Sequence, residues 1–482
     1  MKSKRKSFIT RVIWMAIVMI AVGVLAVLTL FEVIAPLMPE DSVNSYFDNA
    51  RIRTETVGVM LFMGIALPCA LVWMGIALIP RRRKDGKPDE TLEVEWNLGR
   101  EEPRSEESRE KKKKKLSANA KKEAVRFSTL SALDREMADQ PNVAYNDRIS
   151  LEEFCDRFRA YAAHERFLYY DIDDIRRFVA SLGVSPIIIM QGMSGTGKTS
   201  LATVFGDFVM NKSNVIPIQP MWKERSDMIG YFNEFTERFN EMPLLCTLYE
   251  ANYSKNLYIT ILDEMNIARV EYYFADFLSL LELPNQKDRM LEVVSDTWAK
   301  DPKLLRKGRI PLPSNMWYIG TANNDDSTFA ISDKVYDRAM IINLDKKAKP
   351  FVAPATAPVR ISIDYWNSLV EKAKADYALS DKQAENLKKL DAYLVEHFRV
   401  TFGNRIMKQI TQYVPLYMAC GGSELDALDD MISKKIFRKL ETQNPVYIRN
   451  ASDGLFSYMD ELFGHDAMRQ CREYLKRLQR NA

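Results

Sequence analysis

The sequence predicts an α/β fold, with a parallel sheet at its centre, helices after the sheet and two membrane-spanning helices before it. Three observations lead to this prediction. Short apolar runs at residues 186–190, 257–262 and 317–321 each lead into a polar loop, as strands buried on both faces of a parallel sheet do. Residues 363–482 place apolar side chains at helical spacing and contain few glycines. Two long stretches near the amino terminus carry no charge.

Length and composition exclude several classes of protein. The chain of 482 residues is long enough for about three domains. Its 68 Lys and Arg residues balance 65 Asp and Glu residues, so the net charge of +3 gives no general indication of nucleic-acid binding. The five cysteines lie far apart, and only three histidines are present. A small secreted scaffold, a disordered chain and a zinc enzyme are therefore excluded.

The first 80 residues have the pattern of a membrane anchor. Residues 12–31 are a run of 20 without charge and residues 57–79 a run of 23, and as helices both would cross a hydrocarbon core of about 30 Å. Lys and Arg flank the two runs on their outer sides, whereas the connecting loop is mainly acidic. By the positive-inside rule both termini would be cytoplasmic. The alternatives are a cleaved signal peptide for the first run and a buried core helix for the second.

The composition divides the chain into four parts. Residues 1–80 would be the anchor, which makes the protein integral to a cell membrane. Residues 81–124 are almost wholly polar with blocks of like charge, which predicts a flexible linker. The α/β core would cover residues 125–346 and lie in the cytoplasm. A helical lid with extra carboxyl-terminal helices would cover residues 347–482, after a proline-containing connector.

The core begins with a predicted amphipathic helix. Ser150 and Glu153 have the spacing of a capping box, in which each side chain accepts a backbone hydrogen bond from the other end of the first turn. Phe154, Phe158 and Tyr161 then fall on one face of the helix.

A phosphate-binding loop follows the first apolar run. Residues 192–199 match the complete pattern G-x-x-x-x-G-K-[ST] between a predicted strand and a predicted helix. Glycines allow backbone N–H groups to turn toward phosphate, and the helix amino terminus adds positive potential. We expect Lys198 to contact the β- and γ-phosphates and the Thr199 hydroxyl to bind Mg²⁺. The predicted nucleotide contacts are Gly192, Met193, Ser194, Gly195, Thr196, Gly197, Lys198, Thr199 and Ser200.

The second apolar run ends in Asp263 and Glu264. An acidic residue at the carboxyl end of a buried strand can complete the Mg²⁺ shell, which is the role expected for Asp263. Glu264 would then be the general base that polarises the attacking water. The alternative is an ordinary surface turn after a strand. Because the pair lies behind a phosphate-binding loop, the sequence favours the catalytic interpretation.

The third apolar run leads into Asn323, which is followed by further Asn and Asp residues. If this strand neighbours the phosphate-binding loop, the Asn323 amide could hold the attacking water by a hydrogen bond. The alternative is a turn that Asn and Asp favour for local reasons.

Together these motifs resemble the AAA+ ATPases, and most closely the dynein-related, McrB-like and MoxR-like branch. The resemblance rests on residues 219–222 with 227–233, on residues 262–271, on residues 320–323 and on Asp337-Arg338-Ala339 ahead of an apolar run. It covers residues 150–441 and does not extend to the predicted spans or linker. It implies a sheet of strand order 5-1-4-3-2, a carboxyl-terminal helical lid and a homo-oligomeric, hexameric ring.

The resemblance also implies roles for single residues. Asn323 takes the sensor-1 position, and Asp326 takes the acidic position three residues later. Arg338 matches the arginine finger, which enters the site of the neighbouring subunit and neutralises charge on the phosphate. The alternative for Arg338 is an arginine at a helix end that pairs with Asp337 or Asp333.

The resemblance also bears on further positions. Arg405 matches the sensor-2 position, with an ordinary surface arginine as the alternative. Trp222 and Arg269 are expected to serve packing or intersubunit contact. Residues 283–312 correspond to an insertion that forms a pore-facing hairpin in related ATPases; it could grip nucleic acid or an acidic polypeptide, or be a solvated loop. Its basic residues are Lys287, Arg289, Lys300, Lys303, Arg306, Lys307 and Arg309.

Three functional hypotheses follow. The first is a membrane-tethered ring ATPase that hydrolyses ATP, with GTP possible, in the presence of Mg²⁺ and remodels or moves an unknown protein or nucleic-acid client. The second is a McrB-like motor subunit of a nucleic-acid defence system, with a separate effector subunit. The third is a nucleotide-dependent membrane scaffold that switches without relying on hydrolysis.

Overall fold

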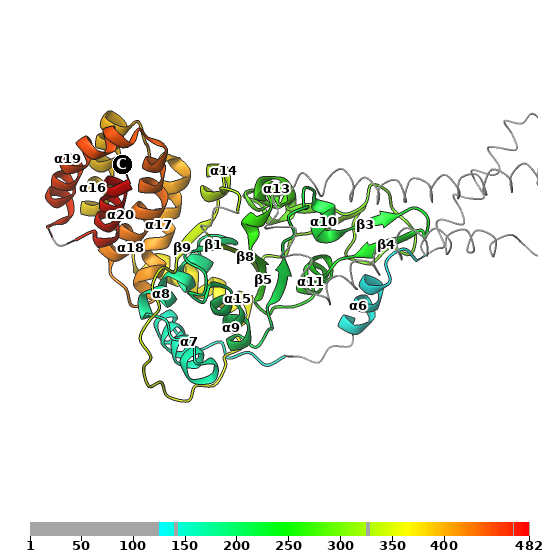
Figure 1. Cartoon of the computed structure of the whole chain (residues 1–482). Helices are drawn as coiled ribbons and strands as arrows, with labels where there is room; N and C mark the ends of the chain where they lie inside the picture. The colour runs from blue at the N-terminus through cyan, green and yellow to red at the C-terminus, as the bar shows by residue number, and fades with distance from the viewer. Residues whose placement is uncertain (1–124, 139–142, 324–327, 466, 482) are drawn as a thin grey trace, which may run out of the picture. The chain divides into compact units, whose positions relative to one another are not determined.

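A five-stranded parallel sheet forms the centre of the computed structural model, which describes residues 125–138, 143–323, 328–465 and 467–481 (Figure 1). The strand order is β2-β5-β8-β1-β9, and every neighbouring pair is parallel. Numbered along the chain, these five strands read 2-3-4-1-5, which is the predicted order seen from the other edge. The predicted α/β fold with this sheet is confirmed. The strands are β1 (Ile187–Gln191), β2 (Asn214–Pro217), β5 (Tyr258–Asp263), β8 (Met316–Ala322) and β9 (Met340–Asn343).

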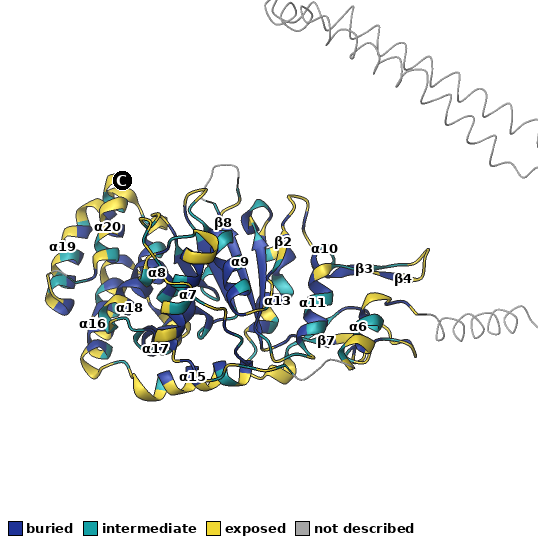
Figure 2. Cartoon of the chain, turned by 90° about the horizontal axis from the view of Figure 1, so that it is seen from below, coloured by how far each residue is buried: buried dark blue, intermediate teal, exposed yellow. Residues whose placement is uncertain are grey.

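Both faces of the sheet are buried, which explains why its central strands are apolar at every position rather than at alternate ones. In β1, Ile188 and Met190 belong to one apolar cluster, whereas Ile187 and Ile189 belong to a second cluster on the other face. The residues of β5 and β8 alternate between the same two clusters. Figure 2 shows these strands as a buried centre with helices around it.

Helices α7 (Leu151–Arg166), α8 (Ile172–Leu182) and α9 (Lys198–Phe208) contribute to the first cluster. At the amino end of α7, the Ser150 hydroxyl accepts a hydrogen bond from the Glu153 backbone N–H at 3.2 Å, which is one of the two bonds of the predicted capping box. The predicted apolar face of α7 is buried as well. Edge-to-face contacts between aromatic rings join α7 to α9, with ring centroids 5.2 Å apart for Phe154 and Phe208.

The second cluster is formed by shorter elements between β2 and β8, and by one helix that precedes them all. The helices are α6 (Thr129–Ala138), α10 (Arg225–Ile229), α11 (Pro243–Ala251), α12 (Val270–Tyr273) and α13 (Ala275–Leu281), with the 3-10 turn η4 (Met265–Ile267). The 3-10 turn η5 (Gln286–Asp288) follows α13 and is exposed. Two antiparallel hairpins, β3 (Gly230–Asn233) with β4 (Arg238–Glu241) and β6 (Met290–Glu292) with β7 (Arg309–Pro311), extend from these elements.

Helices follow the sheet. The short helix α14 (Asp333–Tyr336) precedes β9, and residues 345–362 after β9 contain neither helix nor strand. The remaining elements share the first apolar cluster with the sheet. They are α15 (Ile363–Asp376), α16 (Asp381–Phe398), α17 (Gly403–Ala419), α18 (Glu424–Met431), the π-helical turn η6 (Ile432–Ile436), the 3-10 turn η7 (Phe437–Thr442), α19 (Pro445–Phe463) and α20 (Arg469–Asn481).

The predicted localisation requires a correction. We expected an integral membrane protein, but none of the helices in the described part of the chain is long and apolar enough to cross a bilayer. The longest of them, α19, has 19 residues and includes four charged side chains. The runs 12–31 and 57–79 on which the prediction rested, and the linker 81–124, lie outside the described residues. Membrane localisation is therefore unsupported, and we do not assign one.

Candidate functional site

The candidate site lies at the carboxyl edge of the sheet, where three neighbouring strands end. In the register of the sheet Gln191 of β1 lies beside Ala322 of β8, and Leu262 of β5 lies beside Gly320 of β8. The strands are parallel, so the residues that follow them meet at one edge. The sequence motifs that we predicted to act together are therefore neighbours in space.

The loop after β1 closes around a buried ammonium group. Lys198, at the start of α9, is 7% exposed, and its Nζ donates to the backbone carbonyls of Gly192 at 2.9 Å and Met193 at 2.8 Å. The Thr196 hydroxyl donates to the same Met193 carbonyl at 3.0 Å. Tyr170, which lies between α7 and α8, donates its hydroxyl proton to the carbonyl of Gly197 at 3.0 Å. The loop is thus a formed structure with a cation at its centre.

Gly192 begins this loop in a conformation that requires glycine. Its φ is 142°, and an added Cβ would lie 2.5 Å from the carbonyl oxygen of Leu344. The Leu344 backbone N–H in turn donates to the carbonyl of Gln191 at 2.9 Å. The chain leaving β9 therefore packs directly against the start of the loop, and a side chain at residue 192 would force them apart.

Hydroxyl groups from two elements converge on Asp263 at the end of β5. Its Oδ1 accepts hydrogen bonds from the Thr199 hydroxyl at 2.8 Å and from the Thr321 hydroxyl at 2.8 Å. The Thr321 hydroxyl oxygen also accepts the backbone N–H of Glu264 at 2.9 Å. A carboxylate beside a threonine hydroxyl, next to the predicted phosphate-binding loop, is a donor set that suits Mg²⁺, which prefers oxygen ligands and keeps several waters. The residues present therefore fit the predicted metal.

Glu264 is exposed and has a left-handed backbone, with φ of 51°. This conformation is uncommon for a residue other than glycine and needs support from its surroundings. Thr321 holds the backbone N–H, and the next residue, Met265, is fully buried. Met265 lies against Gly320 so closely that a Cβ at residue 320 would be 1.9 Å from its sulfur atom. The glycine in β8 thus makes room for the turn that presents the Glu264 carboxylate.

Asn323 directly follows β8 and is tied by its backbone to the turn after β5. Its carbonyl accepts hydrogen bonds from Nδ2 of Asn266 at 2.9 Å and from the Thr328 hydroxyl at 3.1 Å. Asn266 is buried and belongs to the same motif as Asp263 and Glu264. Asp326, for which we predicted an acidic role, lies outside the described residues.

Arg338 and Arg405 form a second group, which meets at Glu282 just after α13. Nη2 of Arg338 lies 2.8 Å from Oε2 of Glu282, and Nη2 of Arg405 contacts the other carboxylate oxygen. The alternative partners that the sequence suggested for Arg338 are engaged elsewhere, because Asp333 pairs with Arg438 at 2.6 Å and Asp337 pairs with Lys439 at 3.6 Å. The two arginines are therefore brought together, and their contacts run to Glu282 rather than to the loop 192–199.

The Arg338 backbone lies at the opposite edge of the sheet from the loop 192–199. Met340 of β9 lies beside Ile188 of β1, and the Arg338 carbonyl accepts a hydrogen bond from the Ser185 hydroxyl at 3.0 Å. Ser185 precedes β1, whereas the loop follows it. At about 3.3 Å per strand residue, the two ends are separated by on the order of 20 Å.

Sequence reasoning missed two residues of this arrangement. Thr321 was included in a motif but received no role, although a threonine at the end of an apolar strand before Asn323 was a usable signal. Glu282 gave no signal, because its partners are 56 and 123 positions away in the sequence. Trp222 is buried against Tyr273, and Arg269 stacks over Phe329, so both make packing contacts.

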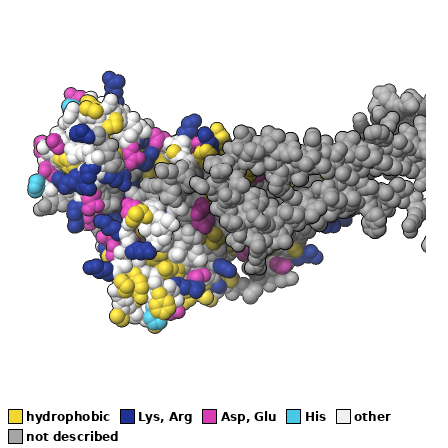
Figure 3. Space-filling model, viewed as in Figure 1, with side chains coloured by type: hydrophobic (Ala, Val, Ile, Leu, Met, Phe, Trp, Pro, Cys, Tyr) yellow, Lys and Arg dark blue, Asp and Glu magenta, His cyan; other side chains and the backbone are white. Residues whose placement is uncertain are grey.

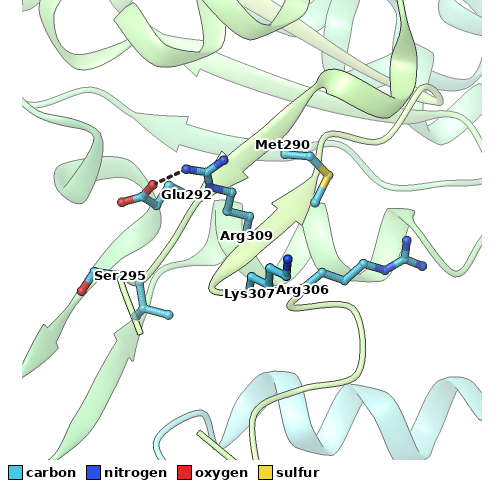
Figure 4. Close-up of a pocket in the computed structure, with 7 residues that line it drawn as sticks. Met290, Glu292, Ser295, Arg306, Lys307 and Arg309 are labelled. Atoms are coloured by element: carbon cyan, nitrogen blue, oxygen red, sulfur yellow. Dashed lines mark hydrogen bonds and ion pairs between the residues drawn. The ribbon is translucent and has the colours of Figure 1, made fainter. Parts of the chain in front are cut away.

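The basic insertion contains a hairpin with a hollow of about 540 Å³ beside it. An ion pair of 3.1 Å between Arg309 and Glu292 crosses the hairpin, as Figure 4 shows. Just before β7, Lys307 and Gly308 have positive φ and form a two-residue turn between Arg306 and Arg309, whose backbones exchange two hydrogen bonds. On the face seen in Figure 3, basic and acidic side chains are interspersed. The residues lining the hollow are Met290, Glu292, Val294, Ser295, Arg306, Lys307 and Arg309.

Comparisons with known proteins give limited matches. Residues 360–482, which include α15 to α20, match the family model described as "Domain of unknown function (DUF8727)". No curated protein matches the sequence. A solved structure of a candidate ATPase from Cytophaga hutchinsonii is similar, with 13% identity and a TM-score of 0.38, over 67% of this chain and 90% of that chain. A full-length MCM homologue from Methanopyrus kandleri has 8% identity and a TM-score of 0.35, over 60% of this chain and 61% of that chain. At these values neither structure assigns a function.

Proposed function

We propose that this chain hydrolyses a nucleoside triphosphate with Mg²⁺ at an AAA+-type site that two copies of the chain share. One observation carries the proposal: the Thr199 hydroxyl lies 2.8 Å from the Asp263 carboxylate, directly after a loop that encloses Lys198. In this proposal residues 125–346 form the catalytic core and residues 347–482 the lid. ATP is the first substrate to test, with GTP beside it, because the base-binding contacts are not defined.

The residues at the carboxyl edge of the sheet would bind the phosphates. Backbone N–H groups of residues 192–200 and the amino end of α9 favour negative charge there. The Lys198 ammonium, which donates to two loop carbonyls, can donate to the β- and γ-phosphate oxygens instead. Thr199 and Asp263 would hold Mg²⁺, which when bound neutralises charge on the phosphates.

Glu264 would activate the water that attacks the γ-phosphorus. Its exposed carboxylate would accept a proton from that water while the water oxygen forms the new P–O bond, and the nucleoside diphosphate would leave with the electrons of the broken P–O bond. Asn323, held next to the Glu264 turn through Asn266, would orient the same water. ATP and water would thus give ADP, phosphate and a proton.

Arg338 would serve the site of a neighbouring copy. Its backbone is at the far end of β1 from its own phosphate-binding loop, which supports a contact in trans rather than in cis. Nε of Arg338 is buried without a hydrogen-bond partner, and its Nη2 is paired with Glu282. An arginine supplied in this way contributes about 10³–10⁵ to the rate in related phosphoryl transfers.

A ring and a macromolecular client complete the proposal. They are supported by the resemblance of the sequence motifs to AAA+ ATPases, in which neighbouring subunits share sites. A nucleic-acid client and a separate effector subunit, as in the McrB-like alternative, have no specific observation in their favour here.

The test compares hydrolysis by the full-length wild type and two variants. Glu264→Gln removes the base but keeps the shape of the side chain, and we expect hydrolysis to fall by about 10²-fold or more while nucleotide binding persists. Glu237→Gln is the matched control, because Glu237 is also exposed and also has a left-handed backbone, with φ of 52°. This control should keep wild-type activity. Binding without turnover in the wild type, with Glu264→Gln unchanged, would replace this proposal by a non-hydrolytic switch.

A further inference from the structure

The turn that carries Arg338 is held by four hydrogen bonds from three side chains. Each of its consecutive carbonyls, from Tyr336 to Ala339, accepts a hydrogen bond from a side chain. The donors are Lys435 Nζ to Tyr336 at 2.6 Å, Gln409 Nε2 to Asp337 at 3.2 Å, Ser185 Oγ to Arg338 at 3.0 Å, and Lys435 Nζ again to Ala339. Of these donors, Lys435 and Gln409 belong to the helices after the sheet.

Lys435 is the central donor, because it bonds the carbonyls before and after Arg338. It lies in the π-helical turn η6 and is 2% exposed. Its neighbour in the turn, Lys434, is equally buried but faces a different group, the carboxylate of Asp430 at 2.5 Å. The wider π turn thus carries two consecutive buried lysines with separate partners, and single π turns are frequent at functional sites.

Side chains just after Lys435 enclose the same short segment. The Arg438 guanidinium lies over the Tyr336 ring at 4.0 Å and pairs with Asp333 at 2.6 Å. Lys439 lies 3.6 Å from Asp337. The segment from α14 to β9 therefore has three of its polar partners, Lys435, Arg438 and Lys439, in η6 and η7 of the lid.

We propose that Lys435 is a positioning residue for Arg338, which makes the arginine presented to a neighbouring copy dependent on the lid of its own copy. The inference rests on the proposed function, because it assumes that Arg338 acts in a neighbour's site. Lys435 does not touch the nucleotide in this account; it fixes the backbone from which the arginine extends. Displacement of a reacting group by about 1 Å can cost about 10²-fold in rate, so a fixed backbone at residue 338 has direct consequences for catalysis.

The test uses mixtures of full-length variants. Glu264→Gln has a dead site and an intact arginine, whereas Arg338→Ala has an intact site and no arginine. Mixing the two variants should restore activity, because the intact site of an Arg338→Ala copy can receive the intact arginine of a neighbouring Glu264→Gln copy. Lys435→Met removes both hydrogen bonds and should lower kcat by about tenfold to 100-fold with little change in KM.

The mixtures then show where the Lys435→Met defect lies. We expect Glu264→Gln to restore the activity of Lys435→Met, whereas Arg338→Ala should not restore it. The reason is that Lys435→Met would be defective only in the arginine that it donates. A purely structural defect would damage its own site and remove this selectivity. Lys434→Met is the matched control; it alters the same turn and a buried lysine but no bond to residues 336–339, and it should show no such pattern.

A second variant covers the case in which Lys435→Met does not fold. Gln409→Met removes only the bond to the Asp337 carbonyl, and it should show the same pattern with a smaller loss. Restoration of either variant by Arg338→Ala, or wild-type kcat in both, would overturn the role of Lys435 alone. Failure of Glu264→Gln and Arg338→Ala to restore each other would overturn the shared site, and the inference with it.

Discussion

Thr321 connects Asp263, the proposed metal ligand, to Glu264, the proposed general base, through a single hydroxyl. It donates to Asp263 and accepts the backbone N–H of Glu264, and its side chain is 3% exposed. Without it a carboxylate oxygen would lose one of its donors and a backbone N–H would be left unpaired, which costs about 1–3 kcal/mol for a buried group. The left-handed backbone of Glu264 depends on the same support.

We therefore expect Thr321→Val to reduce hydrolysis by about 10²-fold and to weaken Mg²⁺-dependent nucleotide binding more than metal-free binding. The comparison is Thr203→Val, which removes a hydroxyl bonded to the carbonyl of Thr199 at 2.8 Å in α9. Titration of nucleotide with and without Mg²⁺ separates the two effects. Equal losses in the two threonine variants would show that Thr321 has no special role.

The burial of Lys435 also leads to a prediction about how stability depends on pH. Burial is the main cause that lowers the pKa of Lys435 to about 7; Arg438, Lys439 and Arg405 act in the same direction, and Asp337 opposes them. In the unfolded chain the pKa of a lysine is about 10.4. Between these two values the unfolded chain binds a proton that the folded chain does not, so folding becomes more favourable as the pH rises.

The midpoint of thermal unfolding of the wild type should therefore rise relative to that of Lys435→Met as the pH increases from about 7 to about 9. Lys435→Met lacks this titration, so other groups cancel in the difference between the two proteins. Melting curves at several pH values provide the measurement. Parallel pH profiles would mean that Lys435 stays protonated in the folded protein.

Gly320 of β8 and Met265 of η4 pack against each other next to the site. The sulfur of Met265 occupies the space in which a Cβ of residue 320 would lie, so β8 and the turn after β5 are in direct contact. Overpacking of a buried contact costs about 1–3 kcal/mol. In this place the strain would also move the residue next to Met265, which is Glu264.

Gly320→Ala should therefore lower stability by about 1–3 kcal/mol and reduce hydrolysis more than nucleotide binding. Met265→Ala should open space for the new methyl group, so the double variant should lose less stability than the sum of the single variants. Denaturant unfolding of all three proteins tests this coupling. Strict additivity would show that the two positions do not contact each other.

The sequence predicted those elements whose signal is local and missed those that depend on distant contacts. The apolar runs of β1, β5, β8 and β9 are visible because both faces of these strands are buried. The edge strand β2 was missed; it is four residues long and Val215 is 43% exposed, so it has no continuous apolar run. Likewise, the π turn of η6 and the hairpin of β3 and β4 follow from packing rather than from a residue pattern, and the hairpin of β6 and β7 was expected only from the resemblance.

The candidate site was predictable to the same extent. Lys198, Thr199, Asp263 and Glu264 belong to short motifs, and the parallel register of three strands brings these motifs together. By contrast, the Glu282 carboxylate joins Arg338 and Arg405 across long sequence separations. No spacing rule predicts such a contact, and neither Glu282 nor Lys435 lies in a recognisable motif.

On the scale of the whole molecule, the sheet separates the loop proposed to bind phosphate from the arginine proposed to act on a neighbouring copy. The proposed phosphate-binding loop, residues 192–199, is at the carboxyl edge, and the Arg338 backbone is at the amino edge, beside Ser185. In a single copy Arg338 is paired with Glu282, and in the proposed function it acts at the phosphates of a neighbouring copy. Hydrolysis per copy should therefore rise with protein concentration until the copies are assembled, and this rise should be absent in Arg338→Ala.

The most direct test of a site shared between copies is hydrolysis by an equal mixture of full-length Glu264→Gln and Arg338→Ala. Each variant alone should be nearly inactive. In randomly mixed rings about one quarter of the sites would join an intact site to an intact arginine, so the mixture should recover about one quarter of wild-type activity. Activity no greater than the average of the two separate variants would contradict the shared site.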